Sequence, residues 1–312
     1  MNMKTLLAVA VTIVFWSSAF AGIRAGLDGG YSPGHLVLLR FLSASLVFAV
    51  YALVRGIRLP QRRDLLRIAL LAWTGITLYH LTLTFGERTV PAGTASLLIA
   101  AAPAITALLA MFALKERLSW IGWVGIGLGF GGIVLITLGP GNPHGFSQGA
   151  LLILVSAVST AVFFVFQKPL FARYSAIELT TYFTWIGTLP MLVFLPGFAT
   201  QVEHATAVAT WSAIYIGVFP AAVAYVSWAI ALSSGRATAV SSALYINPVL
   251  AIFIAWIWLG ELPNALSLVG GMIAIVGVVI VNLWGKSRGP METVGATVPA
   301  AGPADVGARE SV

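Results

Sequence analysis

Ten apolar stretches, each about 20 residues long, follow one another along the chain. They occupy residues 5–27, 34–54, 67–86, 91–113, 120–138, 149–167, 177–196, 209–232, 237–259 and 266–284. A helix of that length crosses the roughly 30 Å of hydrocarbon in a bilayer. Lipid offers no water to backbone groups, and the stretches lack the alternation of a barrel strand. The pattern therefore predicts an all-α, polytopic membrane protein with ten transmembrane helices.

The second half of the chain repeats the first. At an offset of 145 residues identical side chains recur, among them the pairs Ala92 and Ala237, Ser96 and Ser241, Pro103 and Pro248, Glu116 and Glu261, Gly125 and Gly270, and Gly132 and Gly277. The repeat predicts one five-helix unit over residues 1–140 and a second over 147–286. The remaining residues, 287–312, are rich in Gly, Ala, Pro and Val. They are expected to form a disordered cytoplasmic tail.

Composition agrees with a membrane protein, since 59% of the residues are hydrophobic and 9% are charged. The net charge of +7 could suggest nucleic acid, but the basic residues follow the positive-inside rule instead. With the N-terminus inside, the predicted exterior side has only Arg24 and Arg88. The cytoplasmic side holds Lys4, Arg55, Arg58, Arg62, Arg63, Arg67, Lys115, Arg117, Lys168, Arg173, Arg236, Lys286 and Arg288. We expect a multi-pass protein of a bacterial inner membrane, with both termini cytoplasmic and no nucleic-acid partner.

The orientation of the two units follows from the same count. Five spans is an odd number, so the second unit enters the membrane in the opposite sense and the repeat is inverted. The first span also imitates a secretory signal peptide, because Lys4 and an apolar run precede Ala19-Phe20-Ala21. The repeat favours its retention, since its loss would leave one unit with four helices. The chain has no cysteine, so disulfides and thiolate metal sites are excluded, and no cofactor is expected.

Several motifs resemble one known family. They are Gly93 to Pro103 (GTASLLIAAAP), Leu114 to Leu118 (LKERL), Tyr245 to Pro248 (YINP) and Leu259 to Leu262 (LGEL). Together with the duplication they resemble the EamA-type branch of the drug/metabolite transporter superfamily, over about residues 5–285. The resemblance implies a ten-helix carrier, often a metabolite exporter, with a central cavity between its halves and peripheral fifth and tenth helices. It does not specify the solute, because the family moves amino acids, sugars, nucleotide precursors and drugs.

Two ionisable residues lie well inside predicted spans, Arg40 in the second and His80 in the third. A charge in hydrocarbon costs at least roughly 2.5 kcal/mol, so Arg40 is expected to face a wet cavity or a partner. It could bind an anionic group of the solute, or it could snorkel to the interface or bond helix-end carbonyls. His80 could bond the solute or carry a proton, or it could be a neutral hydrogen-bonding link between helices.

Aromatic and polar residues recur in the middle of other spans, where rings with a polar group suit a partly apolar solute. Any one of these rings could equally serve packing. Trp residues near span ends, such as Trp73, Trp120 and Trp211, are expected to be interfacial anchors. The predicted substrate site is a cavity drawn from both halves and lined by Trp16, Arg40, Tyr79, His80, Phe163, Tyr182, Trp185, Tyr225, Trp228, Tyr245 and Asn247.

Pro103 and Pro248 are the predicted hinges, because each removes a backbone hydrogen bond in mid-membrane and both copies keep the feature. The alternative is a static bend that fits helices together. Glycines in the fifth and tenth spans, including Gly125, Gly132 and Gly277, favour close helix packing. A homodimer formed through them is left open.

Other function classes find less support in the chain. An intramembrane enzyme would need a nucleophile with a base, or metal ligands, and the sequence has no motif of that kind. A channel or scaffold would make less use of an inverted duplication. A proton-coupled drug or cation exporter would need a buried carboxylate, yet each Asp and Glu falls in a loop, a tail or a span end, with Glu178 nearest the membrane. We therefore expect an alternating-access exporter of amino acids or related metabolites, uncoupled to ions, with His80 the one candidate proton carrier.

Overall fold

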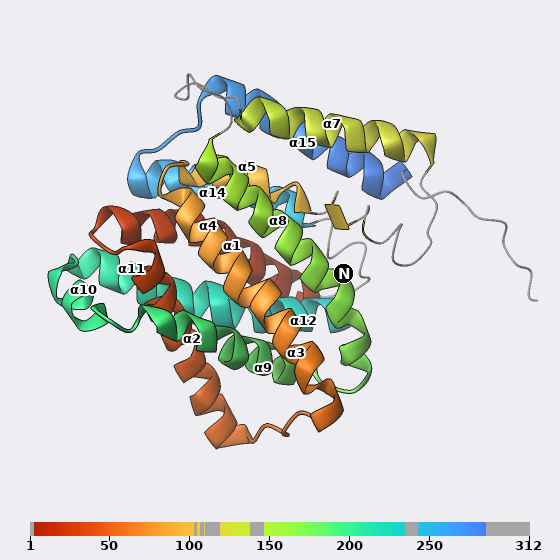
Figure 1. Cartoon of the computed structure of the whole chain (residues 1–312). Helices are drawn as coiled ribbons and strands as arrows, with labels where there is room; N and C mark the ends of the chain where they lie inside the picture. The colour runs from red at the N-terminus through yellow and green to blue at the C-terminus, as the bar shows by residue number, and fades with distance from the viewer. Residues whose placement is uncertain are drawn as a thin grey trace, which may run out of the picture.

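The computed structural model describes residues 3–102, 105–106, 109, 119–137, 147–234 and 243–284. Every regular element in these ranges is helical (Figure 1). In chain order they are α1 Met3–Asp28, α2 Pro33–Arg55, η1 Arg62–Asp64, α3 Leu65–Ala72, η2 Trp73–Leu78, α4 Tyr79–Glu87, α5 Ala92–Ile99, α7 Trp120–Thr137, α8 Gln148–Gln167, η3 Lys168–Ala172, α9 Ala176–Thr188, η4 Leu189–Phe194, α10 Phe198–His204, α11 Ala207–Val218, η5 Phe219–Val223, α12 Ala224–Ser234, η6 Ala243–Ile246, α14 Asn247–Leu259 and α15 Ala265–Trp284.

The predicted fold class is confirmed at the level of an all-helical membrane protein. Seven described helical segments are long and apolar enough to cross a bilayer, and the shorter apolar helices Asn247–Leu259 and Ala265–Val281 follow them. The count of ten spans and the inversion of the repeat stay predictions. Pro103, Glu116 and the tail over 287–312 lie outside the described residues.

The first helix of each predicted unit packs against helices of the other unit. From the first unit, α1 packs against α11, α12 and α14 of the second. From the second unit, α8 packs against η2, α4 and α5 of the first. In each case the first predicted span of one unit contacts the third and fourth predicted spans of the other. The centre of the molecule is therefore lined by elements from both units.

Connections between helices gather at two ends of this bundle. At one end the turn after α1 meets the turn before α11, where the Thr206 amide donates to the Gly29 carbonyl at 2.9 Å. Arg24 Nε also lies 3.0 Å from Glu261 Oε1, beside the loop after α14. We call this the outer end, because the positive-inside rule predicts that it faces the exterior.

The opposite, inner end is held by a buried carboxylate. Asp64 Oδ1 accepts from Arg173 Nη1 at 2.6 Å, and Asp64 Oδ2 accepts from the Tyr174 hydroxyl at 2.9 Å. Burial, supported by the bond to Asp64, raises the pKa of Tyr174. These contacts join the start of the third predicted span to the connection between the sixth and the seventh.

The helices α7 and α15 lie side by side, apart from the centre (Figure 1). A Cβ atom added at Gly125 would lie 2.7 Å from the Gly277 carbonyl oxygen, and one added at Gly270 would lie 2.7 Å from that of Gly132. Gly125 and Gly270 are equivalent in the repeat, as are Gly132 and Gly277, so the interface is self-complementary in the manner of a two-fold contact. The absence of side chains here lets the two backbones touch.

Candidate functional site

A cluster of buried polar and aromatic groups occupies the centre of the bundle. Arg40 on α2 is 3% exposed and His80 on α4 is 2% exposed. The His80 ring centroid lies 4.6 Å from that of Phe41 and 4.5 Å from that of Tyr79. The Arg40 Cζ atom lies 5.6 Å from the Phe41 centroid. Both ionisable residues singled out in the sequence therefore face the interior.

The second unit contributes aromatic groups to the same place. Electrostatic interactions link Arg40 to Tyr225 as well as to Tyr79. Tyr225 and Trp228, both on α12, each have a ring centroid 5.4 Å from that of Trp16 on α1. The structure thus brings together six of the predicted residues, which are Trp16, Arg40, Tyr79, His80, Tyr225 and Trp228. We call these six the central cluster.

The charged and polar groups around this cluster are short of partners. The Nε and Nη1 atoms of Arg40 and both ring nitrogens of His80 make no hydrogen bond within the described part of the chain. The same holds for both carboxylate oxygens of Glu87, which is 0% exposed. Buried polar groups are normally hydrogen-bonded, and an exception calls for an explanation such as a ligand or water.

Two π-helical turns flank the cluster at equivalent positions of the repeat. η2 directly precedes Tyr79 and His80, and η5 directly precedes Ala224 and Tyr225. Because a π-turn adds a residue to the helical ring, it re-aims the side chains that follow it, and such turns are frequent at functional sites. His80 and Tyr225, which correspond at the offset of 145, are therefore both placed by a local widening of their helix.

Each π-turn receives a side-chain hydrogen bond from the first helix of the other unit. Trp16 Nε1 on α1 donates to the Pro220 carbonyl at 3.2 Å, and Ser159 Oγ on α8 donates to the Thr74 carbonyl at 2.6 Å. Sequence reasoning missed both turns. Pro220 was the available signal, since a proline inside a span cannot donate a backbone hydrogen bond, whereas η2 contains no proline.

Three other predicted residues pack beside the central cluster without being part of it. The Phe163 ring packs against Phe183 with centroids 4.9 Å apart. The Tyr182 hydroxyl donates to the Arg58 carbonyl near the inner end, and Trp185 Nε1 donates to the Ser45 carbonyl at 3.2 Å. Phe163 and Tyr182 belong to one apolar cluster with Phe41, whose ring also packs against His80. The polar atoms of Tyr182 and Trp185 already have partners inside the protein.

The remaining predicted positions lie at the start of α14. Ser17 Oγ donates to Asn247 Oδ1 at 2.5 Å, which ties this residue to α1. Pro248 stands in the first turn of α14, after the 3-10 turn η6, where a missing amide hydrogen disturbs no helical bond. The side chain of Tyr245 lies outside the described residues, as does Pro103. The hinge role of the two prolines stays a prediction.

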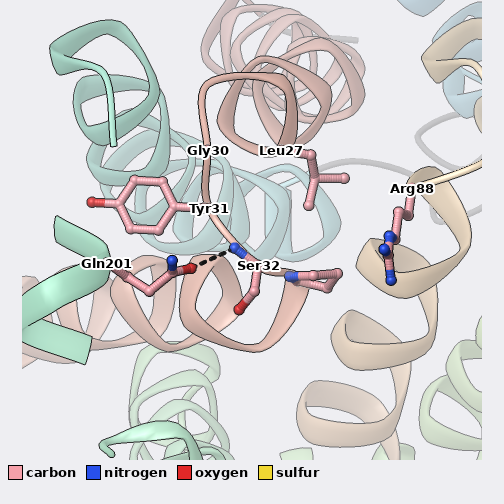
Figure 2. A pocket seen from close by; sticks show the side chains of 7 residues that line it. Leu27, Gly30, Tyr31, Ser32, Arg88 and Gln201 are labelled. Carbon is pink, nitrogen blue, oxygen red and sulfur yellow. Dashed lines mark hydrogen bonds between the residues drawn. The ribbon is translucent and has the colours of Figure 1, made fainter. Parts of the chain in front are cut away.

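A pocket of about 360 Å³ opens at the outer end (Figure 2). In it the Ser32 amide donates to Gln201 Oε1 at 2.7 Å, and Arg88 approaches from the end of α4. The lining consists of Leu27, Gly30, Tyr31, Ser32, Pro33, Arg88 and Gln201. A second hollow of about 500 Å³ lies between α1 and α14 and is lined by Val14, Leu250, Phe253, Ile254, Ile257 and Trp258. Neither hollow is lined by a residue of the central cluster.

Arg24 fastens several segments at the outer end. Its Nε atom pairs with Glu261, and its Nη1 atom donates to the Glu87 carbonyl at 2.8 Å. Glu261 Oε2 in turn accepts from the Ala92 amide at 3.3 Å. These bonds join α1, the end of α4, the start of α5 and the loop after α14. They also enclose the side chain of Glu87, which sequence analysis assigned to a span end and did not list as a site residue.

Comparison with known proteins adds independent information. The EamA-like transporter family matches the chain over residues 3–138 and 147–283. These two segments correspond closely to the two units that the repeat predicts.

Similar curated proteins cover most of the chain. The uncharacterized transporter YdfC of Bacillus subtilis is 39% identical over 277 residues, with 89% of this chain and 90% of that protein covered. A probable terminal-alkyne amino-acid exporter of Streptantibioticus cattleyicolor is 40% identical over 279 residues, covering 89% and 93%. The inner membrane transporter YedA of Escherichia coli K12 is 28% identical over 301 residues, covering 93% and 94%.

A solved crystal structure shares the fold. It superposes with a TM-score of 0.60 at 20% sequence identity and covers 90% of this chain and 97% of the other.

Proposed function

The chain belongs to the EamA-like transporter family, and we propose that it exports amino acids or related small metabolites across the bacterial inner membrane. One observation carries the proposal. The guanidinium of Arg40 is buried at the contact of the two units with its Nε and Nη1 atoms unpartnered. A solute carboxylate is the natural ligand for such a group. The identity of 40% to a probable amino-acid exporter supports the same class.

The aromatic part of the central cluster suits the rest of such a solute. Trp16, Tyr225 and Trp228 offer ring faces for an apolar side chain, while Tyr79 and His80 add polar atoms. In the proposed mechanism the solute binds between the two units and is exposed to each side in turn. Movement toward the exterior then requires the Arg24 bonds at the outer end to open.

The proposed topology is ten spans arranged as two inverted five-helix units, with both termini in the cytoplasm. Reporter fusions check it. A reporter fused after Gly141 is expected to report an exterior location, and one fused after Arg63 a cytoplasmic location, because the flanking basic residues remain inside. The reverse pattern would contradict both the topology and the inversion.

A proton-coupled drug or cation exporter is the second candidate function, and Glu87 is the observation that favours it. Such a carrier needs a buried carboxylate that can hold a proton or a cation in turn. From the sequence, each Asp and Glu is expected in a loop, a tail or a span end, which disfavours coupling; the structure buries Glu87 completely and so supplies such a carboxylate. Accumulation of solute against its gradient, driven by an imposed pH difference, would favour this second function.

The proposed function is tested by counterflow in proteoliposomes. Vesicles preloaded with one unlabelled compound receive the labelled form outside, over a panel of amino acids, sugars, nucleosides and organic cations. Amino acids are expected to exchange without any ion gradient, and protein-free vesicles supply the background. Exchange of sugars, nucleosides or cations alone would overturn the assignment, as would chemical alteration of a supplied compound.

Thiol labelling tests where the site lies, on a background without cysteine. Single cysteines in place of Tyr79, Tyr225 and Trp228 are expected to react with a water-soluble reagent, and the transported amino acid should protect them. The control is Leu46, which is 65% exposed on the outside of α2 and is expected to face lipid. Equal, unprotected labelling at Leu46 and at the cluster positions would remove the cluster from the solute path.

A further inference from the structure

Glu87 is the buried charge that the proposed function leaves unused. It is the last residue of α4 and is 0% exposed, and neither carboxylate oxygen has a partner among the described residues. Resting on the proposed function, we infer that Glu87 and Arg40 are the two poles of one site for a zwitterion. Arg40 binds the carboxylate of a free α-amino acid, and Glu87 binds its ammonium group.

The direction of the two helices makes the charged groups converge. Side chains on a helix lean toward its N-terminus. α2 begins at the outer end, so Arg40 leans outward from the interior. α4 finishes at the outer end, so Glu87 leans inward from there. The two groups therefore approach the same space from opposite depths.

The two poles do not neutralise each other directly. Arg40 and Glu87 interact electrostatically. Within the described structure they form no ion pair, so no guanidinium nitrogen of Arg40 lies within 4.0 Å of a carboxylate oxygen of Glu87. A direct pair would satisfy both charges and close the site. Without such a pair, each side chain can bind one group of an α-amino acid, which carries an ammonium and a carboxylate on the same carbon atom.

One face of α4 continues the polar surface between the poles. His80, Thr84 and Glu87 stand at helical spacing and share a face. Thr84 is 1% exposed, and its hydroxyl, like both ring nitrogens of His80, lacks a partner in the described chain. A threonine in a helix can bond the carbonyl four residues before it, but the Thr84 hydroxyl makes no such bond. It therefore adds a third unpartnered polar group to the face that carries Glu87.

Other partners for Glu87 are accounted for. Arg24 also interacts electrostatically with Glu87, but its Nε atom is engaged by Glu261 and Asp28, and its Nη1 atom by the carbonyls of Glu87 and Arg88. No group of three metal-ligating side chains exists among the residues that the structure describes. A zwitterion neutralises Glu87 and Arg40 together, whereas a simple amine or a simple acid neutralises one and leaves the other buried alone.

The test compares a transported amino acid with two derivatives that each lack one charge. Counterflow is measured for the free amino acid, its N-acetyl form and its methyl ester, in the wild type, Glu87→Gln and Glu87→Asp. The wild type is expected to favour the amino acid over both derivatives by at least roughly tenfold. Glu87→Gln should lose the discrimination against the N-acetyl form and keep that against the ester. Glu87→Asp should retain both, and Glu203→Gln, at an exposed position, is the control.

The outcomes separate this inference from the proposed function. If the wild type moves no amino acid, the proposed function is wrong. If it moves amino acids but Glu87→Gln discriminates as the wild type does, the zwitterion site alone is wrong. Normal amino-acid flux in Glu87→Gln with loss of a wild-type response to an imposed pH gradient would also overturn it, and would assign Glu87 to proton coupling. Thermal unfolding of each purified variant confirms that the compared proteins are folded.

Discussion

Replacing Arg40 by methionine is expected to lower amino-acid transport by roughly 10- to 100-fold while leaving the protein equally or more stable. Hydrogen bonds to a charged group contribute about 1.5–3 kcal/mol, which corresponds to that range of affinity. The opposite effect on stability follows from burial, because the guanidinium lies 3% exposed with its Nε and Nη1 atoms unpartnered. Methionine retains much of the apolar stem and removes a charge that the folded state must desolvate.

Two measurements on the same preparation check this prediction. Counterflow per folded molecule gives the transport rate, and thermal unfolding in detergent gives the stability. Arg55→Met is the matched control, since it removes the same charge from an exposed position on the same helix and is expected to change neither quantity. A variant with unchanged transport and a lowered unfolding temperature would identify Arg40 as a structural tie.

The membrane character and the duplication were predictable because they rest on sequence patterns that do not depend on how the helices pack. Apolar runs of about 20 residues have few alternatives to a spanning helix. The packing of α1 and α8 against the opposite unit is compatible with the repeat, since these two helices occupy equivalent positions in it. For Arg40 and His80 the cost of a charge facing lipid favoured an interior position, but for Arg40 it left snorkelling to the interface open.

The aromatic residues were harder to place, because a ring is stable against lipid, protein or solute alike. Trp16 and Tyr225 meet in the central cluster, whereas Phe163 and Tyr182 pack in an apolar cluster with Phe41. Spacing along one helix cannot decide between these outcomes, since the neighbours that decide it lie on other helices, from either unit. The π-turns were hidden for the same reason, as the Trp16 hydrogen bond to the Pro220 carbonyl joins distant parts of the sequence.

Glu87 shows how a position in sequence can mislead about depth. It ends an apolar run and precedes Arg88 and Thr89, which indicates an interfacial residue. Arg24 binds the carbonyl of Glu87 and the carboxylate of Glu261, and these bonds draw the loops over the end of α4. The burial of Glu87 is therefore a tertiary effect with no local signal.

Replacing Gly132 by leucine is expected to destabilise the protein by about 1–3 kcal/mol, the usual cost of forcing atoms into a filled interface. A Cβ atom at Gly132 would meet the Gly270 carbonyl oxygen and lie 2.6 Å from the Ala274 amide nitrogen. Both are backbone atoms, so relief requires α7 and α15 to separate. The neighbouring Gly131 supplies a matched control, because a Cβ atom there has nothing within 4 Å.

The measurement is thermal unfolding of Gly132→Leu and Gly131→Leu in the same detergent. Only Gly132→Leu is expected to unfold at a lower temperature, since leucine favours a helix equally at both positions. Gly277, the repeat equivalent of Gly132, faces the Gly125 carbonyl, so Gly277→Leu should lose a similar amount. Because α7 and α15 contact mainly each other, the folded fraction of either variant should keep the wild-type KM. A changed KM with unchanged stability would contradict this expectation and would mean that the α7–α15 pair takes part in transport.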